Sequence, residues 1–504
     1  MIIQAIERAS FFDMSLFLTV TLISMIIFAM SDYLKSVVLA FRVPGPKAYP
    51  IIGNTNFAIE GDVFQNRGVP LSRICPGLLR LWFFIFPFFA VYEPEYLQKI
   101  LGSKGNTEKS FFYKFLHNFL GKGLITNSGT KWSSHRRYIQ PAFRNSILEK
   151  FVKTFADSAQ SLQEKIMRGP DVLNITQFVN DCVLDVLNEA VLGVPILERA
   201  TKGKNEESPW RQGKVVVQNR VARPWLMFSW IYNWTKTSSD EIEQKGRLNA
   251  FTREMIRKRR EESENGAVKE RVSLLEYMID INKRHPDFTD EDIIDETCTF
   301  MLAGQDSVGA SLAFTMYLIA QHPEHQQKCI DEIDEIFGSD NRSPTMNDLY
   351  DMKYLEMCIK EALRLYPAVP IMARKLGEEV RCGKYLLPVG AEVFILPYIT
   401  HRLEHIFLDA EKFVPERFTP ENVEKRNPYA FLPFSAGPRN CIGHKFAIIE
   451  MKTIISRILR SFTMHTVPGK SFEPLFRITL RAKGGLYVRF EPRNNNNNND
   501  EKVQ

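Results

Sequence analysis

The chain has 504 residues, and a hydrophobic fraction of 44% with an aromatic fraction of 12% suits a large core that encloses an apolar pocket. The net charge of +6 is compatible with anionic lipids or an acidic partner protein, but no run of lysine and arginine is dense enough to indicate nucleic-acid binding. The seven cysteines are odd in number and scattered without CxxC spacing, which argues against a disulfide framework or structural zinc and for a reducing compartment.

An apolar run near the N-terminus, Met14 to Ser31, contains no charged residue. It is just long enough to span a bilayer, for which about 20 residues are typical. A cleaved signal peptide or a buried core helix is the alternative, but no small-residue cleavage site follows the run. Charges before the run are net negative while Lys35 and Arg42 follow it, so the bulk of the protein is expected on the cytosolic side. We therefore predict a membrane anchor over residues 1–32, with Met14 as an alternative start.

A proline-rich connector follows the anchor, with Pro44, Pro46 and Pro50 close together. Prolines fix φ and stop helices, so this segment joins the anchor stiffly to a large domain over residues 33–493. Along that domain, amphipathic runs alternate with short β-like segments at 79–84, 88–92, 391–396 and 485–490. The pattern predicts a mainly α single domain with a small β region.

Two side chains that can hydrogen-bond one acceptor occur in Trp-Ser-Ser-His-Arg-Arg. Trp132 and Arg136 are four residues apart, so on a helix they face the same way and present an indole N–H and a guanidinium together. The alternative is a basic surface patch.

A long helix is predicted between Thr289 and Pro323, because Thr289 can cap it with Asp292 three residues on and Pro323 stops it. Asp306 is a carboxylate in the apolar part of this helix. Burial of a carboxylate costs free energy, so we expect Asp306 either to form an ion pair or to have a catalytic role. With the hydroxyl of Ser307 beside it, it could pass protons. A structural salt bridge of Asp306 is the alternative.

A possible charge network lies further along the chain. Glu361 and Arg364 are three residues apart on a predicted helix and can pair, which by itself is common in helices. Arg417, in Phe-Val-Pro-Glu-Arg-Phe, supplies a second arginine shortly before the cysteine loop described next.

The loop Phe-Ser-Ala-Gly-Pro-Arg-Asn-Cys-Ile-Gly, from Phe434 to Gly443, directly precedes a helix-like run. The thiolate of Cys441 can bind haem iron axially and favour O–O cleavage. Gly437 and Gly443 let the backbone approach a flat macrocycle, and Arg439 can meet a propionate. The alternative for a lone cysteine is a small buried side chain in a tight turn.

The chain ends in six asparagines and a mostly charged segment. This composition has nothing to bury, so we predict a disordered tail over residues 494–504.

The spacing Phe-x-x-Gly-x-Arg-x-Cys-x-Gly resembles the haem-binding loop of the cytochrome P-450 superfamily, and the resemblance extends from about Val43 to Phe490. Further details are similar to the family-four group, which includes fatty-acid ω-hydroxylases and many insect enzymes. The segments that carry this closer similarity are Lys109-Ser-Phe-Phe-Tyr-Lys-Phe-Leu116, Gly121-Lys-Gly-Leu-Ile125, Arg223-Pro224-Trp225, Leu365-Tyr366-Pro367 and Asn440-Cys441-Ile442-Gly443.

The resemblance implies the cytochrome P-450 fold and a role for each motif. Ala-Gly-Gln-Asp-Ser, which contains Asp306 and Ser307, is similar to the oxygen-activation motif. Trp132 and Arg136 would bind one haem propionate and Arg374 the other. Glu361, Arg364 and Arg417 would form the charge network that supports the cysteine loop.

The implied protein is a membrane-anchored haem-thiolate monooxygenase of the endoplasmic reticulum with a cytosolic catalytic domain. Its cofactor would be haem b, and NADPH–cytochrome reductase would supply electrons, with cytochrome b5 as an additional donor. Residues 111–120 and 222–234 are expected to line a pocket for a lipophilic fatty acid, hormone or xenobiotic, with terminal hydroxylation of fatty acids as the leading prediction. A peroxide-rearranging haem enzyme that needs no NADPH and a non-enzymatic haem or lipid sensor are the alternatives.

Two positions depart from the family pattern. Ser307 stands where threonine is usual, so it keeps the hydroxyl but loses the β-branch that stiffens the rotamer. Ala303 stands where several family-four ω-hydroxylases carry a glutamate that esterifies a haem methyl. We therefore predict haem without a covalent ester, and coupled turnover that survives with Ser307 but with more uncoupling to peroxide.

Overall fold

The computed structural model describes residues 16, 19–21, 23–25, 30–58, 63–194, 223–264, 273–477 and 479–493. Much of the predicted anchor and the whole predicted tail, residues 494–504, lie outside this part. Among the described residues, no helix combines the length and the apolar character needed to cross a bilayer. The boundaries of the anchor, the catalytic domain and the tail therefore stay predictions.

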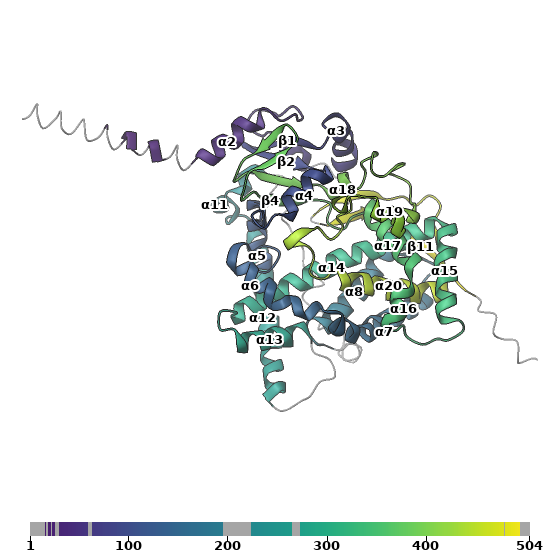
Figure 1. The fold of residues 1–504 in the computed structure, drawn as a ribbon. Coiled ribbons are helices and arrows are strands. Elements are labelled where there is room, and N and C mark those ends of the chain that lie inside the picture. Colours follow the sequence, from purple (N-terminus) through teal and green to yellow (C-terminus); the bar gives the residue numbers. More distant parts are fainter. Residues whose placement is uncertain are drawn as a thin grey trace, which may run out of the picture.

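The described part of the chain is mainly helical with a small β region, as predicted (Figure 1). The helices are α2 (Ser31–Ala40), α3 (Val69–Ile74), α4 (Pro94–Gly102), α5 (His117–Leu120), α6 (Gly129–Ile139), α7 (Asn145–Arg168), α8 (Ile175–Ala190), α11 (Ser229–Tyr232), α12 (Lys236–Glu264), α13 (Leu274–Arg284), α14 (Asp290–Gln321), α15 (Pro323–Phe337), α16 (Met346–Asp351), α17 (Lys353–Leu365), α18 (Pro397–Thr400), α19 (Pro420–Glu424) and α20 (His444–Ser461).

The strands form four small sheets, of which the largest has the order β1-β2-β7-β4. A three-stranded sheet has the order β3-β11-β8, and β9 pairs with β10 and β5 with β6. The strands are β1 (Leu78–Phe83), β2 (Phe86–Val91), β3 (Val172–Asn174), β4 (Met372–Lys375), β5 (Val380–Cys382), β6 (Tyr385–Leu387), β7 (Glu392–Ile395), β8 (Phe462–Thr466), β9 (Glu473–Phe476), β10 (Leu480–Lys483) and β11 (Tyr487–Pro492).

The four predicted β-like segments correspond to β1, β2, β7 and β11. Pro87 lies inside β2, opposite Trp82 of β1. A proline cannot donate to a sheet, and β2 is an inner strand. The position is tolerated because the parallel pairing of β2 with β7 begins only at Phe88.

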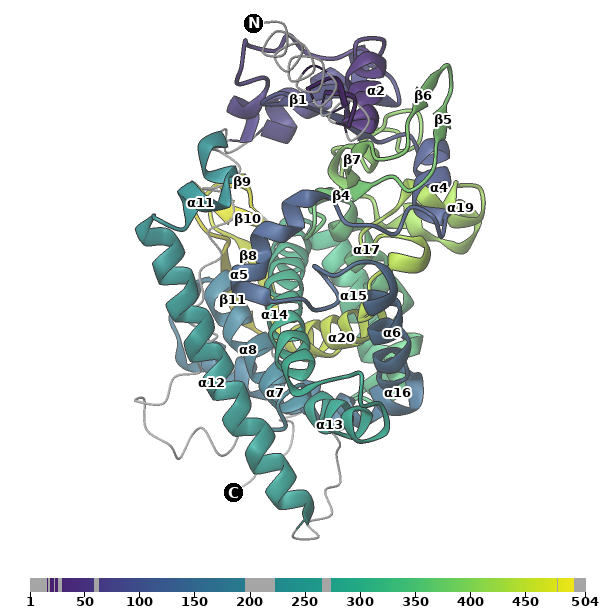
Figure 2. The same cartoon turned by 90° about the vertical axis from the view of Figure 1, so that its left-hand side faces the viewer.

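The long helix predicted from Thr289 is α14, which has 32 residues and passes through the centre of the molecule (Figure 2). Thr289 and Asp292 form the predicted capping box, and Pro323 begins the next helix, α15. Side chains are buried on several faces of α14, as expected of a helix that is apolar over most of its surface. It packs against α8, α17 and α20, and so places its middle turns opposite the cysteine loop.

Candidate active site

A cavity of about 670 Å³ lies between the middle of α14 and the loop that precedes α20. Most of its wall is apolar, with side chains from β1, β2, α5, α7 and α8 among them. Cys441 and Gly443 line one side, and Ala303, Asp306 and Ser307 line the side formed by α14. The structure thus brings the predicted cysteine and the predicted proton-handling pair to one enclosed space.

Cys441 ends a tight loop and presents its side chain to the cavity. Its N–H donates to the carbonyl oxygen of Phe434 over 2.8 Å, which closes the loop on itself. Burial raises the pKa of the Cys441 thiol, while the Gly443 N–H and the Arg136 guanidinium act in the opposite direction. A cation coordinated by the sulfur would complete the stabilisation of a thiolate.

The structure gives a packing reason for glycine at only one of the two glycine positions of the loop. Gly443 lines the cavity, and a Cβ built there would meet only ordinary contact with Phe143, at 3.8 Å. Gly437 is not part of the cavity wall. Its φ is +71°, and an added Cβ would collide with the carbonyl oxygen of Leu101 at the end of α4. Packing against α4 therefore requires glycine at position 437, in addition to the close approach to the haem that we predicted for it.

Several cationic side chains line the cavity, and we call four of them, Lys109, Arg136, Arg374 and Arg439, the cationic cluster. Trp132 lines the cavity as well. The Arg439 guanidinium lies over the Trp132 ring, 4.1 Å from its centroid. Arg374 is almost fully buried (1% exposed), and its guanidinium donates to the main-chain carbonyl oxygen of Ala373 over 3.0 Å.

The charges of the cationic cluster are poorly compensated. Burial and the charges of Arg374 and Arg439 hold the pKa of Lys109 well below its usual range. Burial, followed by the charge of Arg374, lowers the pKa of Arg439 to about 9. The Nε of Arg439 is buried without an acceptor in the described part of the chain. Such a cluster favours a buried anion with several carboxylate oxygens, and the two propionates of a haem fit this requirement.

Asp306 and Ser307 form the opposite wall. The Ser307 hydroxyl donates to the Ala303 carbonyl oxygen over 2.6 Å. Asp306 accepts a hydrogen bond from Thr479 over 2.6 Å and forms an ion pair with Arg481 of β10. The salt bridge considered as the alternative role of Asp306 is therefore present, but the carboxylate still faces the cavity.

The predicted charge network is completely buried at its centre. Glu361 and Arg364 of α17 both have 0% exposed side chains and form a two-pronged pair, with Nε–Oε2 at 2.7 Å and Nη2–Oε1 at 2.8 Å. The Arg417 Nε lies 3.3 Å from Glu361 Oε1, and the Val414 N–H donates to the same oxygen over 2.9 Å. The network therefore fastens α17 to the segment that leads to the cysteine loop.

The pocket-lining prediction was right for one segment and wrong for the other. Phe112, Tyr113, Leu116 and Leu120 line the cavity, whereas none of the described residues 223–234 does. Trp225, Phe228, Trp230 and Trp234 of the second segment are exposed instead, and Tyr232 is buried away from the cavity. A sequence pattern without tertiary contacts does not distinguish these environments from pocket lining.

Lys109 was not predicted as a site residue. The signal that could have found it is its place at the start of the Lys-Ser-Phe-Phe-Tyr segment, which also supplies the cavity residues Phe112 and Tyr113.

The family model for cytochrome P450 matches residues 43–488 of the chain. This chain belongs to the cytochrome P450 family. It is 53% identical to probable cytochrome P450 4aa1 of Drosophila melanogaster over 98% of both chains. It is also 36% identical to cytochrome P450 4c3 of the same species over 90% of both chains, and 33% identical to cytochrome P450 4V2 of Homo sapiens over 89% of both. These similarities assign this P450 to the family-four group.

The protein is therefore a P450 monooxygenase with a thiolate-ligated haem, a lipophilic substrate and a redox partner. The residues in the cavity fit that cofactor, because Cys441 offers the sulfur ligand and the cationic cluster offers partners for the propionates.

Proposed function

We propose that this P450 hydroxylates fatty acids near the end of the chain remote from the carboxylate, with electrons from NADPH–cytochrome reductase. The observation that carries the substrate proposal is the cavity wall. It is apolar over most of its surface from Cys441 outwards, and it includes Arg477, whose side chain is exposed. A carboxylate at Arg477 would leave the alkyl chain in the apolar cavity and its far end toward Cys441.

Haem b, bound by Cys441, supplies reductive O₂ activation and the insertion of one oxygen atom into a C–H bond. The rest of the chemistry falls to the protein. The cationic cluster holds the propionates and so fixes the orientation of the ring. The Asp306 side chain is partly exposed (30%), so its carboxylate can take a proton from water. The neighbouring Ser307 hydroxyl can release its bond to the Ala303 oxygen and pass a proton into the cavity.

The proposed reductase contact is the face behind Cys441. Arg137, Arg144 and Lys445 are exposed there, and Lys445 reaches the side chain of Asn145 over 3.0 Å. A basic face attracts an acidic flavoprotein surface, and the same face could accept cytochrome b5.

We also propose that the protein lies on the endoplasmic reticulum membrane with a single N-terminal anchor and a cytosolic catalytic domain. Trp225, Phe228, Trp230 and Trp234 are all about half exposed or more, and Trp234 is 89% exposed. Figures 1 and 2 place α11 at the same end of the molecule as α2. Exposed tryptophans favour the headgroup region of a bilayer, which supports the proposal.

The test is a visible-absorption titration of the ferric protein with long-chain fatty acids, the matching n-alkyl alcohols, terpenoid and steroid hormones, and apolar xenobiotics. We expect fatty acids to shift the spectrum from low to high spin, and Arg477→Gln to weaken the acids about tenfold while it leaves the alcohols unchanged. A shift with hormones or xenobiotics and none with fatty acids would overturn the substrate proposal.

Turnover with purified reductase and NADPH distinguishes the other functions. Product formed from a fatty acid at the expense of NADPH supports the proposal. Conversion of lipid hydroperoxides without NADPH would indicate the peroxide-rearranging alternative. Ligand binding that never stimulates NADPH oxidation would indicate a sensor.

A further inference from the structure

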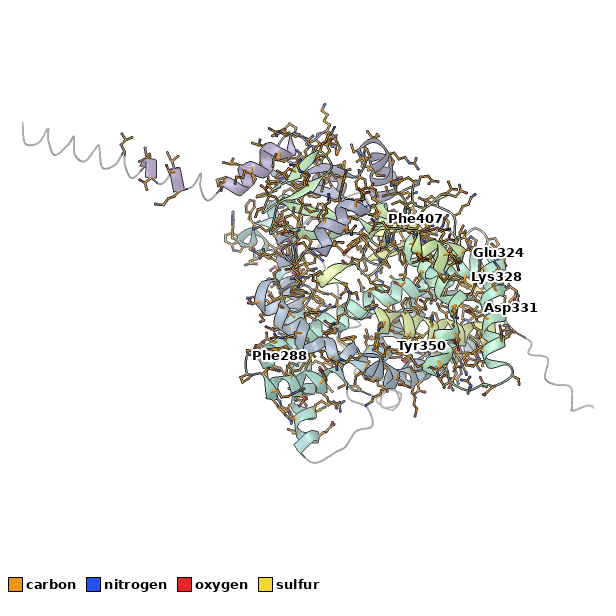
Figure 3. The ribbon with its side chains drawn as sticks, in the orientation of Figure 1. Phe288, Glu324, Lys328, Asp331, Tyr350 and Phe407 are labelled. Atoms are coloured by element: carbon orange, nitrogen blue, oxygen red, sulfur yellow. The ribbon has the colours of Figure 1, made fainter. Side chains whose placement is uncertain are left out.

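A buried carboxylate on α14 joins two separate segments of the haem pocket. Glu296 is fully buried and lies ten residues before Asp306. Its Oε1 is 2.6 Å from Nδ1 of His135 on α6, and its Oε2 accepts the Leu124 N–H over 3.0 Å. The His135 ring packs edge-on against Phe288, which Figure 3 labels on the side of the molecule away from α15.

Each of these two segments carries part of the haem pocket. Helix α6 presents Trp132 and Arg136 to the cavity and turns His135 toward α14. The loop over residues 121–128 holds Arg439, because the carbonyl oxygens of Leu124 and Asn127 accept from its guanidinium over 3.4 and 2.5 Å. One carboxylate therefore fixes both the helix that presents Arg136 and the loop that orients Arg439.

The surroundings make this contact difficult to replace. Burial raises the pKa of Glu296, and hydrogen bonds from His135 and the Leu124 N–H act against that rise. His135 also lies 3.8 Å from Asp292, which is paired with Lys131 at 2.5 Å. In so buried a site, solvent does not replace a lost hydrogen-bond partner of His135 or of the Leu124 N–H. The geometry of both segments therefore depends on Glu296.

We propose that Glu296 is a positioning residue for the haem propionates. It acts through His135 on Arg136 and through Leu124 on Arg439, and it touches neither the haem nor the substrate. This role is separate from proton handling by Asp306 and Ser307.

The first test measures haem release in the absence of denaturant, substrate and reductase, by transfer to excess apomyoglobin. We expect Glu296→Leu to release haem about tenfold faster than the native protein, the usual scale for losing a group that orients a cofactor ligand. Glu296→Gln should restore a nearly native rate, because the amide can bond both Leu124 and a neutral His135. The matched control is Asp295→Asn. Asp295 accepts the Lys122 N–H of the same loop over 2.7 Å, and its variant should stay within about twofold of native.

The second test separates positioning from general destabilisation. Haem with both propionates esterified should leave the native protein about tenfold faster than haem, because the cationic cluster no longer binds it. In Glu296→Leu the ratio of the diester release rate to the haem release rate should fall below about threefold. Comparing this ratio between the native protein and the variant is a double-mutant cycle, which measures the coupling between Glu296 and the propionates. If Glu296→Leu does not fold, His135→Leu takes its place in both tests, because it removes the bond between Glu296 and α6 and keeps the bond from the Leu124 N–H.

Two results would overturn the inference. One is an unchanged ratio between haem and its diester in the variant, and the other is an Asp295→Asn variant that loses haem as fast as Glu296→Leu. Neither depends on the fatty-acid proposal, because no substrate is present in these measurements.

Discussion

Replacing Arg364 with leucine removes the two-pronged partner of the buried Glu361 carboxylate and leaves it only the Arg417 Nε and the Val414 N–H, both at Oε1. The native arginine makes two bonds to that carboxylate and donates to the carbonyl oxygens of His401 (2.9 Å), Ala410 (2.6 Å) and Lys412 (3.0 Å). Removal of one member of a buried ion pair costs about 3–5 kcal/mol. We expect Arg364→Leu to lose stability by about this amount, because three carbonyl oxygens lose their donor while Arg417 still partly compensates the Glu361 charge.

The double variant Glu361→Leu/Arg364→Leu tests the reason for the loss. It removes both charges at once, so it should be more stable than the sum of the two single variants predicts, by about 3 kcal/mol. Urea unfolding followed by the Soret band and by tryptophan fluorescence gives the midpoints. A cofactor-binding protein of this size can depart from two-state behaviour, so unfolding rates should be compared alongside them.

The matched control is the exposed pair between Arg257 and Glu254 on α12, whose atoms are also 2.7 Å apart. Arg257→Leu should leave the midpoint unchanged, because solvent screens an exposed pair. The reasoning is refuted if Arg364→Leu loses less than about 1 kcal/mol, or if the losses of the two single variants simply add in the double variant.

Three further predictions concern the cavity and the main sheet. Ser307→Ala should lower the product formed per NADPH consumed by roughly tenfold or more, while Ser307→Thr should equal or exceed the native coupling because its β-branch stiffens the rotamer; equal coupling in all three proteins would contradict a role of the hydroxyl. Acidified organic solvent should extract all haem from the denatured protein, since Ala303 has no carboxylate to form an ester, and haem retained on the polypeptide would contradict this. Burial raises the pKa of Glu392 to about 7 from its ordinary 4.5, because the folded protein favours the protonated carboxyl. The contribution of Glu392 to the free energy of unfolding is therefore fully present below pH 4.5 and is lost as the pH rises through 7. Between pH 4.5 and pH 8, the free energy of unfolding of Glu392→Gln should therefore rise relative to that of the native protein by roughly 2–3 kcal/mol at most. Unfolding midpoints of the two proteins that shift in parallel over this range would contradict the prediction.

Local signals in the sequence predicted the elements that depend on neighbours along the chain. The start of α14 follows from Thr289 and Asp292, three residues apart, and its end from Pro323. The pair of Glu361 and Arg364 lies within one turn of α17, and the cysteine loop is continuous. In each case the interacting groups are close in sequence, so their spacing is sufficient evidence.

Contacts between distant segments were not predictable in this way. The partner of Asp306 is Arg481, 175 residues further on, in a different element. Glu296 is one of three carboxylates among Asp292, Asp295 and Glu296, and nothing in the sequence says which of them is buried against α6. The aromatic side chains at 223–234 were expected inside the cavity, but all of them except the buried Tyr232 are exposed, because hydrophobicity alone does not tell a pocket from an outer face.

The residues of the haem site lie far apart in the sequence, and this separation sets when haem can bind during synthesis. Arg136 and Asn440, which bond each other beside the haem pocket, are 304 residues apart. At ribosomal rates of about 5–20 residues per second, the cysteine loop follows α6 after roughly 15–60 seconds. Throughout this interval the apolar wall of the nascent cavity lacks its sulfur ligand and has to be kept from aggregation. Haem can therefore be ligated only after Cys441 has been synthesised, and its supply competes with misfolding at that late moment.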